Sequence, residues 1–321
     1  MKIVVFGAGG VGAFYGGLLA GAGHDVHFVA RGAQLEALRT RGLHISSLAL
    51  GEIDLPPLHA SERAAEIGRA DLVLVAVKAH QTSSILDDIA ALTDDDTLLI
   101  ALQNGVESDE VLARRFGDRR VVSAVVYVGA TLEQPGLVRH VAAGTLVIGD
   151  RGAVGAERIE RVRDVLASTG LPVRITPDIE RQRWHKLAWN ASFNAISALT
   201  LRSSQELLAT PSSRDLVIGV MREVVAVANA HGVALGEADI EQLVSTTEKA
   251  APIRTSMLVD RERGRQLETD ALIGVVVRKG QERGVATPLA SVLYALLTAV
   301  SAPAAVGRDL PPMEAGSFAP Q

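Results

Sequence analysis

The sequence of 321 residues contains no cysteine. This absence excludes disulfides, thiolate zinc sites, iron–sulfur clusters and a cysteine nucleophile together. It is compatible with a reducing compartment.

Basic runs and metal-ligand patterns are missing as well. Lys and Arg total 32 against 37 Asp and Glu, a formal charge of −5, and no segment resembles the basic tracts that follow a phosphate backbone. Nucleic acid is therefore not an expected partner. The eight histidines do not pair at metal-ligand spacing, and there is no His-Glu-x-x-His, so no metal site is expected. A Gly-x-Ser-x-Gly nucleophile elbow is also absent.

No apolar run is long enough to suggest a membrane span. Residues 285–307 carry no charge, but Pro288 and Pro303 limit a helix there to about fifteen residues, short of the roughly twenty that a span needs. The N-terminus superficially resembles a secretory leader, yet its glycines fit a nucleotide-binding turn better. We interpret the chain as a soluble, cytoplasmic protein that does not associate with membranes.

The apolar content, 48% of the residues, suffices for about two domains with a core each. In the first half, short β-branched runs alternate with helical stretches, which predicts a parallel sheet covered by helices on both faces. The spacing of Leu137–Val141 and Thr145–Ile148 around Ala142-Ala143-Gly144 predicts a hairpin that closes the sheet. The other predicted strands are Lys2–Phe6, Asp25–Val29, Asp71–Val77, Thr97–Ala101, Arg120–Val128 and Val173–Ile175.

From Asp178 to about Ser301 apolar residues recur at helical spacing, which predicts a bundle of helices. Thr210-Pro211, His231-Gly232, Gly284 and Thr287-Pro288 mark helix boundaries. The expected division is an α/β domain over residues 1–176, an all-helical domain over 177–302 and a flexible, proline-containing tail over 303–321.

A glycine-rich turn follows the first predicted strand and precedes a helix that runs to about Ala22. In the Gly-x-Gly-x-x-Gly pattern, Gly7 permits the tight turn, Gly9 lets the backbone approach a pyrophosphate, and Gly12 allows close helix–strand packing. The alternative is a plain turn without a ligand. The residues predicted to bind a dinucleotide here are Gly7, Ala8, Gly9, Gly10, Val11 and Gly12.

Two cations are candidates for binding the cofactor. Arg31 follows the second strand, where a cofactor with a free ribose hydroxyl would favour an acidic residue. An arginine there can bind a 2′-phosphate with two hydrogen bonds, which favours NADP(H) over NAD(H). Lys78 follows another strand and is positioned to meet a phosphate or ribose. The alternative for each is a solvated surface residue.

The second half contains a polar stripe. Lys186, Asn190 and Asn194 are spaced i, i+4, i+8 and lie among apolar residues, so they are expected to line a pocket. Burial would lower the pKa of such a lysine and make it a proton donor near neutral pH. The alternative is a solvated lysine with two asparagines.

The glycine turn and this stripe occur together with further motifs: Val77-Lys78-Ala79, Gln103-Asn104-Gly105, Thr255-Ser256-Met257-Leu258 with Asp260, and Glu268-Thr269-Asp270 with Gly274. Their order and spacing resemble the ketopantoate reductase family, the 2-dehydropantoate 2-reductases, over nearly the whole chain to about residue 300. The resemblance implies a Rossmann-type parallel sheet joined to an all-helical C-terminal domain, with the active site between them.

The resemblance also implies roles for individual residues. Lys186 would be the general acid that protonates the ketone as NADPH delivers hydride, and Glu268 would contact the substrate hydroxyl, the cofactor and the lysine. Asn104 would lie by the nicotinamide, Lys186 and the substrate. Asn190, Asn194 and Ser256 would bind substrate oxygens. The implied activity is the NADPH-dependent reduction of 2-dehydropantoate to pantoate in pantothenate biosynthesis, by a monomer or a homodimer.

Three residues depart from the family pattern. Ile253, Val259 and Ile273 stand where many members carry polar side chains. Loss of hydrogen-bonding groups favours a more apolar 2-oxo acid or ketone as an alternative substrate. A non-catalytic NADP(H)-binding regulator is a further alternative, but it would not need Lys186 or Glu268.

Overall fold

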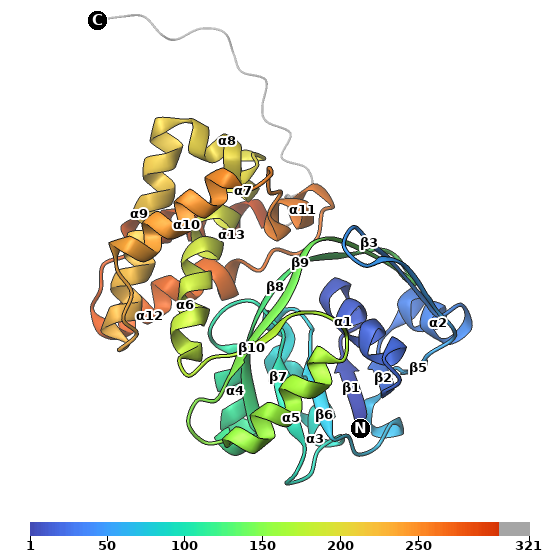
Figure 1. The fold of residues 1–321 in the computed structure, drawn as a ribbon. Coiled ribbons are helices and arrows are strands. Elements are labelled where there is room, and N and C mark those ends of the chain that lie inside the picture. Colours follow the sequence, from blue (N-terminus) through green and yellow to red (C-terminus); the bar gives the residue numbers. More distant parts are fainter. Residues whose placement is uncertain (302–321) are drawn as a thin grey trace, which may run out of the picture.

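A sheet of ten strands dominates the N-terminal half of the computed structural model, which describes residues 1–301 (Figure 1). The predicted tail from 303 to 321 lies outside the described residues. The strands are β1 (Lys2–Phe6), β2 (Asp25–Val29), β3 (Leu43–Ser47), β4 (Gly51–Leu55), β5 (His59–Ser61), β6 (Leu72–Val75), β7 (Leu98–Ala101), β8 (Val121–Gln134), β9 (Leu137–Gly149) and β10 (Val173–Ile175).

Six strands form a parallel unit in the spatial order β5-β2-β1-β6-β7-β8. If the inserted strands β3 and β4 are left out, this is the order 3-2-1-4-5-6 of a dinucleotide-binding sheet. The strand order reverses between β1 and β6, and sheets of this order bind ligands beyond the carboxyl ends of the strands at such a point. The predicted Rossmann-type sheet is thus confirmed.

The hairpin predicted within residues 137–148 is wrong. These residues form the single strand β9, which pairs antiparallel with β8, and the turn between the two strands lies at Pro135-Gly136. Between the pairs Tyr127↔Thr145 and Val128↔Ala143 the register skips Gly144, whose φ is +123°. The segment is therefore a β-bulge. A bulge and a turn both favour small residues and positive φ, so the local sequence does not distinguish them.

Helices cover the sheet and then form the whole C-terminal half. After Ile175 the described residues contain no strand, as predicted. Pro211 and Pro288 are the first residues of their helices, and Gly284, with φ +67°, ends another. The helices are α1 (Gly10–Gly21), α2 (Gly32–Thr40), α3 (Leu86–Ala90), α4 (Ser108–Phe116), α5 (Ala156–Ala167), α6 (Ile179–Trp189), α7 (Ala195–Thr200), α8 (Ser204–Ala209), α9 (Pro211–Ala230), α10 (Glu237–Lys249), α11 (Ser256–Glu262), α12 (Val275–Arg283) and α13 (Pro288–Ser301).

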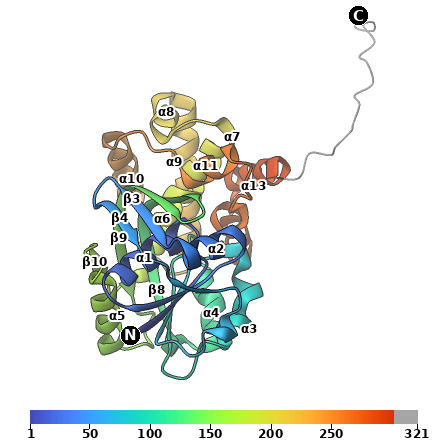
Figure 2. The ribbon, with the colours of Figure 1, turned by 90° about the vertical axis from the view of Figure 1, so that its right-hand side faces the viewer.

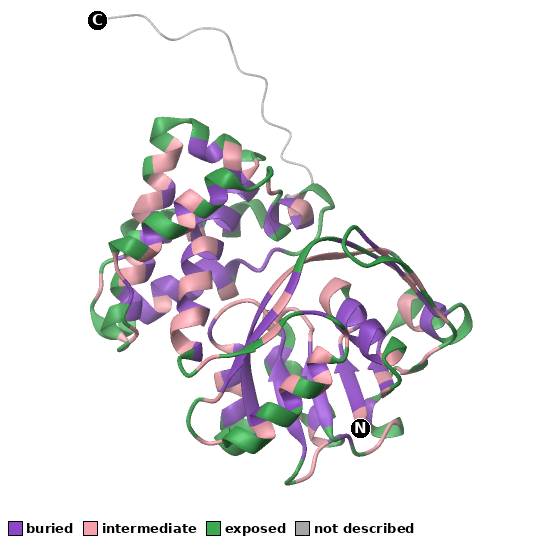
Figure 3. Ribbon diagram, viewed as in Figure 1, coloured by how far each residue is buried: buried purple, intermediate pink, exposed green. Residues whose placement is uncertain are grey.

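Each half has its own hydrophobic core. All four residues of β6 are buried, because helices cover both faces of the parallel sheet (Figure 3). In the helical half the core surrounds α9, which buries Val217, Val220 and Val224. The two halves meet where α6 packs on β8 and β9, and Figure 2 shows the helical half gathered beside the sheet.

Among residues 1–301, every helix falls short of the length and apolar character that crossing a bilayer requires.

Candidate active site

Three of the predicted motifs follow the carboxyl ends of neighbouring parallel strands. The glycine turn follows β1, Lys78 follows β6 and Asn104 follows β7. In a sheet of this order, ligands bind in the crevice at this edge. The topology therefore brings together groups that are about 70 and 100 residues apart in the sequence.

Glycine is required by the fold at some positions of the turn but not at all of them. Gly7 has φ +103°, and a Cβ there would lie 2.7 Å from the backbone nitrogen of Val77; a Cβ on Gly12 would lie 2.0 Å from the carbonyl oxygen of Gly7. Both glycines are thus required by the fold. A Cβ on Gly9 would meet no described atom within 4 Å, and Gly9 precedes the first turn of α1, where backbone N–H groups lack intrahelical partners. At Gly9 the fold alone does not demand glycine.

The other residues of the turn pack into the sheet half. Ala8 is buried in a hydrophobic core of the sheet half, and Val11 is partly buried against the same core. A Cβ on Gly10 would lie 2.5 Å from the carbonyl oxygen of Ala130 on β8. Their predicted role in cofactor binding therefore falls to their backbone rather than to their side chains.

Lys186 lies at the junction of the two halves. Its half-buried side chain extends from α6, and Nζ donates hydrogen bonds to Asn104 Oδ1 at 2.8 Å and to the carbonyl oxygen of Val126 on β8 at 2.6 Å. Burial lowers the pKa of Lys186 from 10.5 to about 8, although the negative charge of Glu268 opposes this shift. An ammonium has three N–H donors, so one remains for another acceptor.

Asn190 and Asn194 are both buried, but the helix that carries them is not regular. A π-helical turn over Asn190–Asn194 separates α6 from α7, so the three residues of the predicted stripe do not follow regular α-helical spacing throughout. Asn190 borders a small cavity of about 10 Å³ together with Lys186 and Asn104. π-helical turns are rare and are found mainly at functional sites.

Asn194 connects this turn with α11. Its Nδ2 donates to Asn190 Oδ1 at 3.2 Å, and its Oδ1 accepts from Ser256 Oγ and from the backbone nitrogen of Met257, each at 3.3 Å. Ser256 itself is exposed at the first position of α11. The structure thus brings together three residues predicted to bind substrate: Asn190, Asn194 and Ser256.

Glu268 and Lys78 form a second link between the halves. Lys78 Nζ donates to Asp260 Oδ2 at 2.7 Å and to Glu268 Oε2 at 3.3 Å, and the backbone nitrogen of Ala79 donates to Glu268 Oε1. Burial alone would lower the pKa of Lys78, but the two carboxylates outweigh it and raise this pKa. Asp260 has no predicted role from its motif, yet it is the nearer partner of Lys78.

Arg31 lies apart from these contacts. It is exposed at the position before α2, beyond the carboxyl end of β2. Within residues 1–301 its guanidinium has no hydrogen-bond or ion-pair partner, so it is available to an anion. Over the same residues no three metal-ligating side chains gather into a possible metal site.

The three departures from the family pattern lie in different surroundings. Ile273 is fully buried in the core of the helical half, so its apolar side chain is explained by packing. Ile253, three residues before α11, and Val259, within α11, are both half-buried.

Comparison with known proteins agrees with this arrangement. Residues 3–153 match the family described as ketopantoate reductase PanE/ApbA, and residues 178–301 match its C-terminal domain. The 2-dehydropantoate 2-reductase of Mesorhizobium japonicum is 33% identical over 92% of this chain and 97% of its own. That of Archaeoglobus fulgidus is 32% identical over 88% of this chain and 92% of its own.

Solved structures give the same result. The crystal structure of 2-dehydropantoate 2-reductase from Geobacter metallireducens has a TM-score of 0.89 at 35% identity, covering 93% of this chain and 99% of that one. A D-mandelate dehydrogenase solved with NADH and anilino(oxo)acetate has a TM-score of 0.87 at 24% identity, which shows a shared fold. On the two domain matches and on relatives aligned over most of their length, the protein belongs to the ketopantoate reductase family, PanE/ApbA.

Proposed function

We propose that the protein is an oxidoreductase that reduces 2-dehydropantoate to pantoate with NADPH, in pantothenate biosynthesis. The observation that carries the proposal is the Lys186 ammonium, which two acceptors hold at the junction of the halves and which has an N–H donor to spare. The names of the relatives support the reductase activity. The substrate is accordingly a small molecule, a 2-oxo acid.

The chain's own residues would act on the substrate carbonyl as follows. The nicotinamide, when bound, supplies the hydride that reduces the carbonyl carbon. Lys186 Nζ donates a proton to the carbonyl oxygen, which would otherwise gain negative charge. Asn104 and the carbonyl of Val126 keep the ammonium directed, and the charge of Glu268 favours its protonated state. Asn190, Asn194 and Ser256 offer hydrogen-bonding groups for the substrate hydroxyl and carboxylate.

A dinucleotide fits the residues of the sheet edge. The space in front of Gly9, beside the N-terminus of α1, would admit the pyrophosphate against backbone N–H groups. Arg31 would bind the 2′-phosphate of NADPH, since a guanidinium matches a phosphate group with paired hydrogen bonds. Lys78 is already paired with Asp260 and Glu268, so its proposed contact with the cofactor would be made from within this pair.

The direct test is NADPH oxidation by the purified protein with 2-dehydropantoate, beside a panel of apolar 2-oxo acids and with NADH as the cofactor control. Fast, NADPH-selective turnover of 2-dehydropantoate is expected. Faster turnover of an apolar 2-oxo acid would instead favour the alternative suggested by Ile253 and Val259. Binding of NADPH without turnover of any substrate would favour a regulator.

Gly9→Ala is expected to weaken NADPH binding at least tenfold without changing the melting temperature of the free protein. The added methyl meets no protein atom but occupies the space proposed for the pyrophosphate. Isothermal titration calorimetry and thermal melting measure the two effects. Gly12→Ala is the matched comparison and is expected to destabilise the fold itself, because its Cβ would collide with the Gly7 carbonyl. Unchanged NADPH affinity in Gly9→Ala would contradict the proposed cofactor site.

The rate of reduction is expected to fall above about pH 8. Lys186 must be protonated to act as an acid, and burial lowers its pKa to about 8, so kcat is constant at lower pH and falls about tenfold per pH unit well above it. The reverse oxidation needs the neutral amine and is expected to rise over the same range. Profiles of kcat against pH in both directions test this. A reduction rate that stays constant to pH 10 would show that another group donates the proton.

A further inference from the structure

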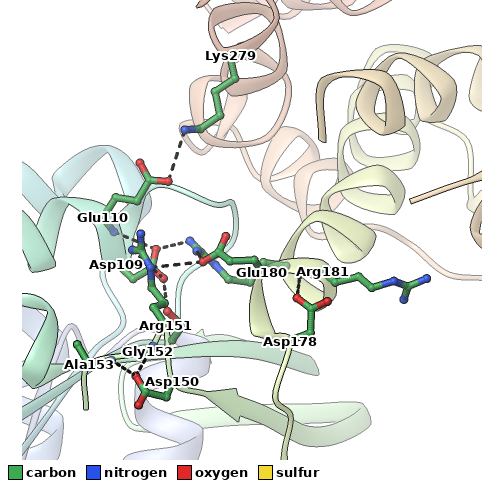
Figure 4. A network of polar contacts seen from close by, with 12 residues as sticks. Asp109, Glu110, Asp150, Arg151, Gly152, Ala153, Asp178, Glu180, Arg181 and Lys279 are labelled. Atoms are coloured by element: carbon green, nitrogen blue, oxygen red, sulfur yellow. Dashed lines mark hydrogen bonds and ion pairs between the residues drawn. The ribbon is translucent and has the colours of Figure 1, made fainter. Parts of the chain in front are cut away.

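A buried ion pair joins the two halves one helical turn before Lys186. Arg183 on α6 and Asp109 on α4 form this pair, and their side chains are only 4% and 2% exposed. Arg183 Nη1 also donates to Glu180 Oε1 at 2.8 Å. Arg151 lies beside this contact, 3.8 Å from Asp109 and 3.5 Å from Glu180, and Figure 4 shows these three residues together.

The side chain of Asp109 joins three elements: α4, β8 and α6. Asp109 lies on α4, its Oδ2 accepts a hydrogen bond from Ser123 Oγ on β8, and Arg183 lies on α6. Removing two charges from water is costly, and an apolar pair of similar volume is often as stable. Stability alone therefore gives no reason for this arrangement of charges.

Lys186 and one of its acceptors lie on two of these elements, α6 and β8, and the other acceptor lies in the loop before the third, α4. Lys186 follows Arg183 by three residues on α6, and Val126 follows Ser123 by three residues on β8. Asn104 lies in the loop that leads into α4. Arg183 and Lys186 also border the same cavity of about 10 Å³. A shift of α6 against β8 or against the loop before α4 would move Lys186 Nζ relative to its two acceptors.

We propose that Arg183 and Asp109 are positioning residues, whose buried pair keeps α6 in register with α4 and β8 so that Lys186 Nζ stays directed at the substrate carbonyl. This inference rests on the proposed function of Lys186. Small displacements of Lys186 Nζ are expected to affect the reaction, since a misplacement of about 1 Å can lower the rate about a hundredfold.

The chain offers a matched control. Lys279 on α12 and Glu110 on α4 form another ion pair between the same two halves, at 3.5 Å, and it does not involve α6 (Figure 4). The double variant Glu110→Gln/Lys279→Met removes this neighbouring contact and is expected to keep kcat within about twofold.

The test is the full-length double variant Asp109→Leu/Arg183→Met, which replaces the charged pair by apolar side chains without leaving a lone buried charge. We expect kcat to fall at least tenfold, while KM for the 2-oxo acid and the dissociation constant of NADPH stay within about threefold. The melting temperature is expected to fall by a few degrees, because the buried Ser123 hydroxyl loses its acceptor Asp109. Wild-type kcat in a folded double variant would overturn the proposal.

Arg183→Lys provides a second, milder test if the double variant does not fold. It keeps the charge but loses the planar fork that reaches Asp109 and Glu180 together, so an intermediate loss of kcat is expected with the plateau of the pH profile lowered. A wild-type plateau in this variant would also overturn the proposal. Failure of the proposed function would look different, because then the wild type would lack turnover or Lys186→Ala would retain it.

Discussion

Lys186→Ala is expected to lower kcat for reduction of the 2-oxo acid by about a hundredfold to ten-thousandfold, the range that general acid catalysis contributes. The variant loses the Nζ donor that Asn104 and the Val126 carbonyl hold at the junction of the two halves. NADPH affinity is expected to change little, since the proposed pyrophosphate and 2′-phosphate contacts lie on the sheet edge.

The measurement is single-turnover oxidation of NADPH together with a binding titration. His185→Gln is a suitable control, because His185 is next to Lys186 on α6 but lies toward Asp239, at 4.0 Å. Its kcat is expected to stay close to that of the wild type. Undiminished turnover in Lys186→Ala would remove the lysine from the mechanism.

Arg31→Ala is expected to weaken NADPH binding by about tenfold to a hundredfold and to leave NADH binding unchanged. A hydrogen bond to a charged group contributes about 1.5–3 kcal/mol, and each 1.4 kcal/mol corresponds to about a factor of ten in affinity. The exposed guanidinium has no hydrogen-bond or ion-pair partner within residues 1–301, so its removal is expected to leave the free energy of unfolding nearly unchanged. Added salt is expected to weaken the wild-type preference for NADPH, since an exposed charge pair is screened.

Titrations of both dinucleotides against the variant measure the loss of preference. Arg39→Ala, on the adjoining helix α2, is the control. Arg39 already donates to the carbonyl oxygen of Ala60, and its removal is expected to leave both affinities unchanged. Equal losses of NADPH and NADH binding in Arg31→Ala would show that Arg31 supports the turn rather than the 2′-phosphate.

The parallel sheet and the helical half can be predicted from the sequence, because the residues buried there form regular apolar patterns along the chain. Apolar runs such as Leu72–Val75 lie buried between two layers of helices, and prolines and glycines mark helix ends. The strands β3, β4 and β5 are missed, since they are short and partly polar. Strand β3, Leu43–Ser47, alternates buried and half-buried residues, and this alternation is the signal that could have revealed it.

The irregular elements depend on contacts that local sequence does not contain. The bulge at Gly144 needs the opposing strand β8, and the π-helical turn over Asn190–Asn194 reads locally as ordinary helix. The second π-helical turn, Asp270–Gly274, packs against the first. The conformation of each irregular element therefore depends on the elements packed against it.

The types of site residue follow from motifs, but their partners do not. Lys78 is predicted as a cofactor ligand, whereas its pairing with Asp260 spans 182 residues of sequence. The Val126 acceptor is a backbone carbonyl and carries no side-chain signal. Arg183 and Asp109 belong to none of the sequence motifs. Their pairing is seen only in the folded chain, where α6 packs on the sheet half.

The attachment of Lys186 to β8 and to the loop after β7 makes its acidity a property of the assembled chain. Cleavage between β10 and α6 followed by separation of the pieces would expose this lysine to water and restore the basicity of a free lysine. Lys186 would then no longer be a proton donor suited to neutral pH. A chimera that exchanged one half alone would therefore have to preserve both contacts of Lys186 to keep its lowered pKa.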